Sequence, residues 1–329
     1  MALSKVSDLR AGIPEVPSGT PDNLLSYGSD GKATDSAYPS TQLPATGVSN
    51  NTPVYNVTGK LTDSRTPHPY AGYIIVDAAG GGDYTSIVTA INAEGAGKKY
   101  LIREGTYNEG ATAATSLVFP ASHFVFQNVT VNLSDNVRAQ YGTNMTGTGD
   151  VLFVGKGLDT EGWVLYIGAV RDLTGLTTSV QNTRTTAPTG WFGSWITVFA
   201  EYWIYNAEIG TIIIKSSTHN CAASPNLIME TIRLNSNTNA PITGRARFVV
   251  EAQTVTNSAA NSNYVRLSGN RTIGGSYTLD IKSGSTAITY GLYITANSDT
   301  NLVTGQVLSG NTKVSNAGTG NIVLIRTTT

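Results

Sequence analysis

The chain has 329 residues, enough for one large hydrophobic core or for two domains. Its formal net charge is −1 and only 13% of its residues are charged, so no basic surface indicates binding to nucleic acid or to an anionic membrane. The single cysteine, Cys221, excludes an internal disulfide framework, and no apolar run reaches the roughly 18 residues that a membrane-spanning helix needs.

Residues 1–72 differ in composition from the rest of the chain. Eight of the twelve prolines lie in this region. Proline fixes φ and removes a hydrogen-bond donor, so we expect an extended arm rather than sheet. A disordered linker and an attachment segment that is held by a larger assembly both fit this composition. We expect residues 1–72 to be an attachment segment.

A short strand, a glycine-rich turn, one helix and a second strand are predicted between residues 74 and 109. Apolar residues at positions 84, 87, 88 and 91 form one helical face. Asp83 is the predicted N-cap of this helix, and Gly95 or Gly97 its end. Residues 100–102 then resume extended structure.

Residues 80–92 and 101–109 carry the patterns G-x-G-D-Y-x-x-I-x-x-A-I and x-I-x-x-G-x-Y-x-E. This block resembles the opening of pectin-lyase-like proteins. The resemblance implies an all-β, right-handed parallel β-helix with an N-terminal capping helix. It does not identify a function, because enzymes, adhesins and phage tailspikes share this architecture.

From residue 117 onward, short β-branched and aromatic runs alternate with turn residues, which predicts strand after strand. The predicted strands are 117–119, 124–133, 151–154, 163–167, 195–199, 212–214, 226–234, 247–255, 264–267, 277–281, 288–294 and 322–325. Residues 174–190 are polar and lack strand character. We therefore expect a β-helix over residues 73–256 and a separate β-structured tip over residues 257–329.

Three glutamates, Glu208, Glu230 and Glu251, are spaced by 22 and 21 residues in similar apolar contexts. Such a period matches one coil of a β-solenoid and predicts that they stack on successive rungs. Stacked carboxylates could serve glycoside hydrolysis. Alternatively, they form a solvated row paired with arginines, and this second interpretation is preferred.

The densest aromatic cluster includes Trp191, Trp195, Tyr202, Trp203 and Tyr205. Exposed aromatic rings can stack on sugars, but aromatic residues are also enriched in subunit interfaces. We favour a core or subunit-interface role over carbohydrate binding.

Motifs of the enzymes with this architecture are missing from the sequence. Asn-Thr-Asp, Asp-Asp and Gly-His-Gly segments, which polygalacturonase-like and pectate-lyase-like sites would need, do not occur. His219 and Cys221 fall short of a four-ligand metal set. We therefore expect no metal, no cofactor and no complete catalytic site.

Together with the arm, the resemblance predicts a non-enzymatic bacteriophage virion protein without a secretory leader. The expected form is a homotrimeric capsid decoration, cement or fibre protein whose residues 1–72 bind the major capsid protein or tail proteins. The alternative is a tailspike that binds or cleaves a host cell-surface glycan. Both place the protein in the virion, on the capsid surface or the tail.

Overall fold

The computed structural model describes two compact units, Met1–Gly72 and Tyr73–Thr329. In the first unit only the backbone of four strands and residues 70–72 are described. In the second, the described residues are 73–168, 172–185, 194–200, 207–219, 228–236, 244–251, 253–255, 261–269, 276–281, 290–296, 299–307 and 312–327.

The N-terminal unit contains two antiparallel strand pairs, contrary to the prediction of an arm without sheet. β1 (Asn23–Tyr27) pairs with β2 (Ala33–Pro39), and β3 (Asn51–Tyr55) pairs with β4 (Leu61–Pro67). Both strands of a two-stranded sheet are edge strands, where proline is tolerated. Three prolines accordingly lie at the last residues of β2 and β4 and beside the register shift in β3.

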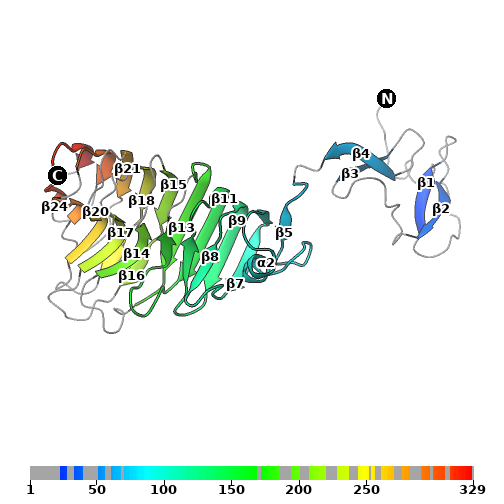
Figure 1. The fold of residues 1–329 in the computed structure, drawn as a ribbon, viewed down its shortest axis with the longest axis horizontal. Helices are drawn as coiled ribbons and strands as arrows, with labels where there is room; N and C mark the ends of the chain where they lie inside the picture. The colour runs from blue at the N-terminus through cyan, green and yellow to red at the C-terminus, as the bar shows by residue number, and fades with distance from the viewer. Residues whose placement is uncertain are drawn as a thin grey trace, which may run out of the picture. The chain divides into compact units, whose positions relative to one another are not determined.

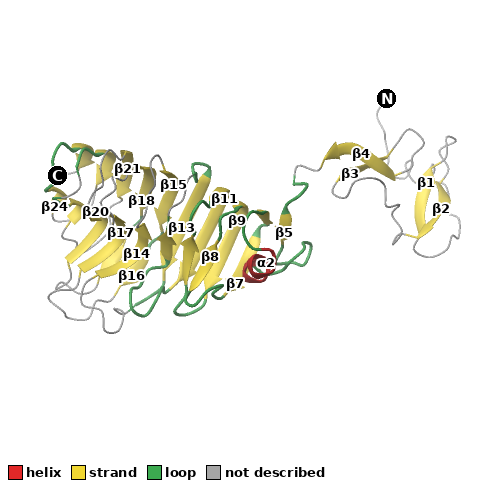
Figure 2. Ribbon diagram, viewed as in Figure 1, coloured by secondary structure: helices red, strands yellow, loops and turns green. Residues whose placement is uncertain are grey.

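The second unit is built mainly from two long parallel sheets (Figures 1 and 2). We call the eight-stranded one sheet one. Its strands, in chain order, are β8 (Ser116–Phe119), β10 (Arg138–Tyr141), β12 (Leu165–Ile167), β14 (Ser194–Ala200), β17 (Ile228–Ser236), β20 (Asn261–Gly269), β22 (Tyr290–Ile294) and β24 (Thr312–Asn316).

The eleven-stranded sheet is called sheet two. Its strands are β5 (Ile74–Val76), β6 (Lys99–Ile102), β7 (Gly105–Glu109), β9 (His123–Leu133), β11 (Thr146–Gly155), β13 (Leu176–Asn182), β15 (Ala207–Ile214), β18 (Gly244–Val250), β21 (Ser276–Ile281), β23 (Leu302–Val307) and β25 (Ile322–Thr327). A short third parallel pair joins β16 (Ser217–His219) to β19 (Gln253–Val255).

From β8 onward the chain alternates between sheet one and sheet two, and each strand pairs in parallel with the next strand of its own sheet. The predicted class, all-β and mostly parallel, is therefore confirmed for the described residues. The same two sheets continue through β20 to β25. Residue 257 and its neighbours lie outside the described residues, so the predicted boundary between a β-helix and a separate tip stays a prediction.

Equivalent positions on successive strands form columns of apolar side chains between the sheets. In sheet one, Leu117, Ala139, Leu165 and Val198 follow one another in register and are buried. Sheet two contributes the column Val131, Phe153, Val180, Ile214 and Val250. Because each buried side chain rests on the equivalent residue of the neighbouring strand, the core is one continuous cluster.

Several described aromatic residues form a cluster in the core near the first strands of the unit. Phe119 lies within 6 Å of the rings of Phe124, Phe126, Tyr141 and Phe153, mostly edge to face. Such arrangements add to the stabilisation that burial of the rings supplies.

β13 lies within the segment that was predicted to lack strand character. Its residues alternate between buried and half-buried positions. The polar residues that point inward are hydrogen-bonded: the Thr178 hydroxyl lies 2.8 Å from that of Tyr141, and the Asn182 amide donates to the Gly162 carbonyl. Polar residues at buried positions hide the alternation that identifies a strand in sequence.

Helix α2 (Ile87–Glu94) follows β5, as the sequence predicts. Its N-cap is Ser86 rather than Asp83, because the Ser86 hydroxyl accepts from the Thr89 amide at 3.2 Å. The Asp83 carboxylate instead accepts from the Ile75 amide at 2.8 Å. Gly95 ends the helix at a φ of 73°, where glycine carries no steric penalty.

Glu109, at the end of β7, is buried and accepts hydrogen bonds from the first turn of α2. Its carboxylate oxygens lie 2.6 Å from the Ile87 amide nitrogen, 3.2 Å from that of Val88 and 2.9 Å from the Ser86 hydroxyl. These are donors that the helix leaves unsatisfied, and the negative charge suits the positive end of the helix dipole. The Y-x-E pattern at residues 107–109 is thus explained by the way it holds the helix.

Candidate functional site

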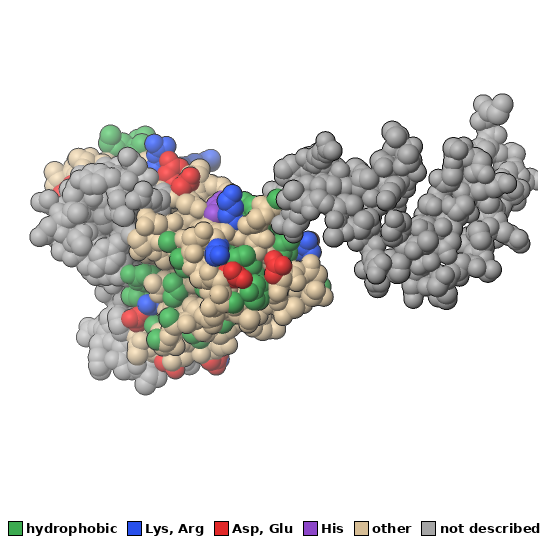
Figure 3. Space-filling model, turned by 45° about the vertical axis from the view of Figure 1, so that its right-hand side comes forward, with side chains coloured by type: hydrophobic (Ala, Val, Ile, Leu, Met, Phe, Trp, Pro, Cys, Tyr) green, Lys and Arg blue, Asp and Glu red, His purple; other side chains and the backbone are tan. Residues whose placement is uncertain are grey.

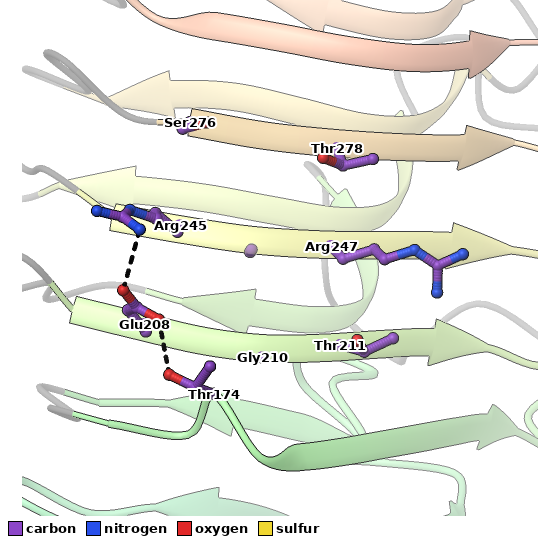
Figure 4. Close-up of a pocket in the computed structure, with 9 residues that line it drawn as sticks. Thr174, Glu208, Gly210, Thr211, Arg245, Arg247, Ser276 and Thr278 are labelled. Atoms are coloured by element: carbon purple, nitrogen blue, oxygen red, sulfur yellow. Dashed lines mark hydrogen bonds and ion pairs between the residues drawn. The ribbon is translucent and has the colours of Figure 1, made fainter.

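An open hollow of about 270 Å³ lies on the outer face of sheet two. Figure 4 shows that its lining side chains project from neighbouring strands. They are nearly all polar or charged, in contrast to the core face of the same strands; the lining residues are Thr174, Glu208, Gly210, Thr211, Arg245, Ala246, Arg247, Ser276 and Thr278. We call this the sheet-two hollow.

Glu208 lies between a hydroxyl and a guanidinium group (Figure 4). Its carboxylate accepts a hydrogen bond from the Thr174 hydroxyl at 2.6 Å and forms an ion pair with Arg245 at 3.4 Å. The Arg245 side chain is 75% exposed, so water screens this ion pair and it contributes little to stability.

Asp172 is a second carboxylate beside the hollow, and the sequence did not single it out. The Thr174 hydroxyl lies 2.7 Å from its carboxylate oxygen, and the Thr174 amide donates to the same oxygen at 3.0 Å. These two donors hold the pKa of Asp172 below its ordinary value. A hydroxyl has one hydrogen, so Thr174 donates to Asp172 or to Glu208 at any moment.

A β-bulge shapes the strand that carries Glu208. The pairing of β15 with β18 shifts between Glu208 and Gly210, and Ile209 is buried at the extra position. Gly210 has a φ of +74°, and a Cβ at this position would overlap the carbonyl oxygen of Leu173. The bulge therefore requires glycine and sets the direction of Glu208.

Glu208 also belongs to a column of seven polar residues in sheet two, which six register pairings join. We call it the charged column; in order it contains Lys99, His123, Thr146, Asp172, Glu208, Arg245 and Ser276. Figure 3 shows one face of the molecule, on which the charged side chains of the second unit form small groups among hydrophobic and other side chains.

His123 occupies the second position of the charged column. Its ring nitrogen Nδ1 lies 3.0 Å from the Thr146 hydroxyl, and its ring packs edge to face on Tyr73. Partial burial, and to a lesser degree the positive charge of Lys99, lower the pKa of His123, while Asp172 opposes this effect.

The predicted stacking of the three glutamates is wrong. Glu208 lies on β15 in sheet two, Glu230 on β17 in sheet one, and Glu251 directly follows β18. In this region one full coil is longer than the spacing suggests, since Ile212 pairs with Thr178 and Phe248, which are 34 and 36 residues away.

Each glutamate has its own surroundings. Glu251 forms an ion pair with Lys215 at 3.5 Å. Glu230 is opposite Ile196 and Asn263 in register, and its side chain lies outside the described set. Among the described residues, Asp172 and Glu208 are two carboxylates that share a donor, the Thr174 hydroxyl, and they are 36 residues apart in sequence. Because coil length varies, a fixed sequence period could not have revealed it.

The predicted aromatic site lies almost entirely outside the described residues. Trp191, Tyr202, Trp203 and Tyr205 are not described; only the backbone of Trp195 is, opposite Met229 in register. Its assignment to an interface or to glycan binding stays a prediction.

The described residues contain no group of three or more potential metal ligands of the histidine, cysteine, aspartate or glutamate type. Within the same residues, no helix has the length and apolar character needed to cross a membrane.

The sheet-two hollow offers carboxylate acceptors, guanidinium donors and several hydroxyl groups at an open surface. This combination can hydrogen-bond a hydroxyl-rich or polar ligand. Its carboxylates are already engaged by Thr174 and Arg245, so a ligand would have to compete with internal contacts. Comparison of the chain with protein-family models, curated proteins and solved structures finds no match.

Proposed function

We propose that the chain is a structural, non-enzymatic virion protein: a homotrimeric capsid decoration, cement or fibre protein. In this proposal Tyr73–Thr329 is a right-handed parallel β-helix that projects as a rigid shaft. Helix α2 covers its first coil and protects strand edges that would otherwise pair with other chains. Residues 1–72 attach the protein to capsid or tail proteins.

The observation that carries the proposal is the division of the chain into two dissimilar units. One is a proline-rich segment with two small hairpins, and the other is a long stack of parallel strands with a continuous core. Separate attachment and projecting units are what a surface appendage needs. The ion-paired and hydrogen-bonded state of Asp172 and Glu208 is consistent with a structural rather than a catalytic role.

Localisation and copy number test this function directly. Antibody against the chain should label purified virus particles in immunogold microscopy, and quantitative mass spectrometry should give a fixed number of copies per particle. Copies on the order of hundreds indicate the capsid, whereas a few trimers indicate the tail. Particles that lack the chain altogether would contradict the proposal.

The second candidate, a tailspike that acts on host polysaccharide, is favoured by one observation, the polar sheet-two hollow. We expect the purified chain to release no reducing ends from host capsule or lipopolysaccharide. Release that is lost on substitution of Glu208→Gln, Glu230→Gln or Glu251→Gln would replace the structural proposal with an enzymatic one. Glu104→Gln, at an exposed position on the chain segment before β7, is the matched control.

A further inference from the structure

The two hairpins of the N-terminal unit are copies of one sequence module. Residues 23–39 read NLLSYGSDGKATDSAYP, and residues 51–67, shifted by 28, read NTPVYNVTGKLTDSRTP. Eight of the seventeen positions are identical. The shared residues are the initial Asn, the Tyr, the Gly-Lys pair, the Thr-Asp-Ser run and the final Pro.

The backbone repeats with the sequence. Asn23 pairs with Pro39 and Tyr27 with Ala33 in the first hairpin. The equivalent residues, 28 positions later, pair in the same way in the second, and both hairpins have a register shift after their first residue. The repeat is therefore one of structure as well as of sequence.

Six of the eight residues kept between the copies have polar side chains, and the other two are glycine and proline. Thr34, Asp35 and Ser36 recur unchanged in the second hairpin, whereas Leu24, Leu25 and Ala37 are replaced by threonine, proline and arginine. A hairpin needs no particular polar triplet for its own strand pairing. Retention of polar rather than apolar residues indicates recognition rather than internal packing.

Each hairpin also has two strand edges with which no other described strand pairs. Both are two-stranded sheets, and the described strands of one are not hydrogen-bonded to those of the other. A two-stranded hairpin by itself is only marginally stable in water. Its exposed edges are sites where another strand can add.

The copies differ in charge. The first carries Asp30, Lys32 and Asp35, a net charge of −1, whereas the second carries Lys60, Asp63 and Arg65, a net charge of +1. The two modules thus share one strand pairing and are opposite in net charge, which favours contact of unlike modules over contact of like ones.

We propose that the repeat is a self-association device, in which the first hairpin of one chain binds the second hairpin of another copy of this chain. The contact is heterologous, so each chain offers one donor and one acceptor module, and three chains can close into a ring. The inference builds on the proposed homotrimer and assigns its contacts to these modules.

The test uses the full-length chain and measures mass by sedimentation velocity. One variant carries Thr34→Ala, Asp35→Ala and Ser36→Ala in the first hairpin, and the other carries Thr62→Ala, Asp63→Ala and Ser64→Ala in the second. We expect a trimer for the parent chain and a monomer for each variant alone. An equimolar mixture of the variants should form a dimer, because it contains one intact pair of unlike modules.

Three other results of the sedimentation experiment would contradict the inference. A monomeric parent excludes self-association. Variants that keep the parent mass show that the hairpins do not hold the chains together, and a mixture that stays monomeric excludes pairing of unlike modules. Circular dichroism confirms that the parallel sheets remain folded in each variant. A monomeric parent would also contradict the homotrimer of the proposed function, whereas the outcomes for the variants concern the hairpin contact alone. Particle localisation is tested separately.

A charge variant tests the choice of partner module. Arg65→Glu changes the second module from +1 to −1 and should weaken association by about fivefold or more at low salt, while Arg65→Lys should leave it unchanged. Equal association of the two variants would show that charge does not select the unlike module.

Discussion

Two side chains of β7, Glu109 and Tyr107, form the hydrogen bonds that connect the region around helix α2 to sheet two. The buried Glu109 carboxylate accepts three hydrogen bonds from the start of α2. The Tyr107 hydroxyl, two residues earlier, donates its one hydrogen to the carbonyl oxygen of Arg103 or of Val76 and accepts from the Ala78 amide. Both residues belong to a pattern that the sequence could only connect with a family resemblance.

Substitution of Glu109→Ala should destabilise the second unit by about 3 kcal/mol, since buried amides and a hydroxyl lose a charged acceptor. Glu109→Gln keeps an oxygen acceptor and should cost less. Chemical denaturation followed by circular dichroism measures the change. Glu104→Ala, at an exposed position, is the control and should have almost no effect; equal losses for the two alanine variants would contradict the assignment.

Stability should also depend on pH through His123. Because its pKa is lowered in the folded chain, the unfolded chain takes up the proton more readily. The free energy of unfolding should therefore fall as the pH drops from about 7 to about 5, and be unaffected by this residue above that range. Denaturation at several pH values should show a smaller fall for His123→Gln. An unchanged pH profile in that variant would exclude the effect.

Gly210 is required by the bulge beside the sheet-two hollow. Gly210→Ala should destabilise the chain by about 2 kcal/mol or more, because the new Cβ meets the Leu173 carbonyl and the φ is positive. Gly110→Ala is the matched control, since no atom lies within 4 Å of its added Cβ. Thermal unfolding compares the two, and similar melting temperatures would contradict a strained site at Gly210.

At the scale of elements, β13 shows how a strand with polar inward residues is held. Tyr141 on sheet one and Thr178 on sheet two share a hydrogen bond across the core. The burial of Tyr141 raises the pKa of its phenol, which keeps the hydroxyl protonated.

Tyr141→Phe and Thr178→Val should each destabilise the chain by about 1–2 kcal/mol, since each leaves one buried hydroxyl without this partner. The double variant should cost less than the sum of the two. Urea denaturation of all four proteins forms a double-mutant cycle. Strict additivity would show that the two hydroxyls do not interact.

Elements with apolar alternation could be predicted from sequence, and those with polar inward positions could not. The strand 123–133 alternates buried and half-buried residues in the way that its sequence suggests. β13 has the same alternation of buried and half-buried positions, but its buried positions include the polar residues Thr178 and Asn182, so the pattern is not visible in the sequence. The hairpins were missed because proline counts against sheet in general, although the edge positions that it occupies here tolerate it.

For the molecule as a whole, the parallel class was predictable and the length of each coil was not. The turns differ in length from coil to coil. Equal spacing in sequence therefore does not place Glu208, Glu230 and Glu251 at equivalent positions, and Glu208 and Glu230 lie on different sheets. Asp172 and Glu208 are neighbours because a parallel bridge pairs them in sheet two. A register of this kind depends on long-range pairing, which local sequence patterns do not encode.

Among the described side chains, the contrast between the two ends of the core has a consequence for the order in which the second unit unfolds. The strands near α2 enclose a dense cluster of rings, whereas at the other end Ile322 and Leu324 are 57% and 64% exposed. Each strand of the two sheets is supported only by its neighbours, so opening should begin at β25 and advance coil by coil. Amide hydrogen exchange should then be fastest in β25 and slowest in β6 to β11, a protection gradient; uniform exchange would indicate all-or-none opening instead.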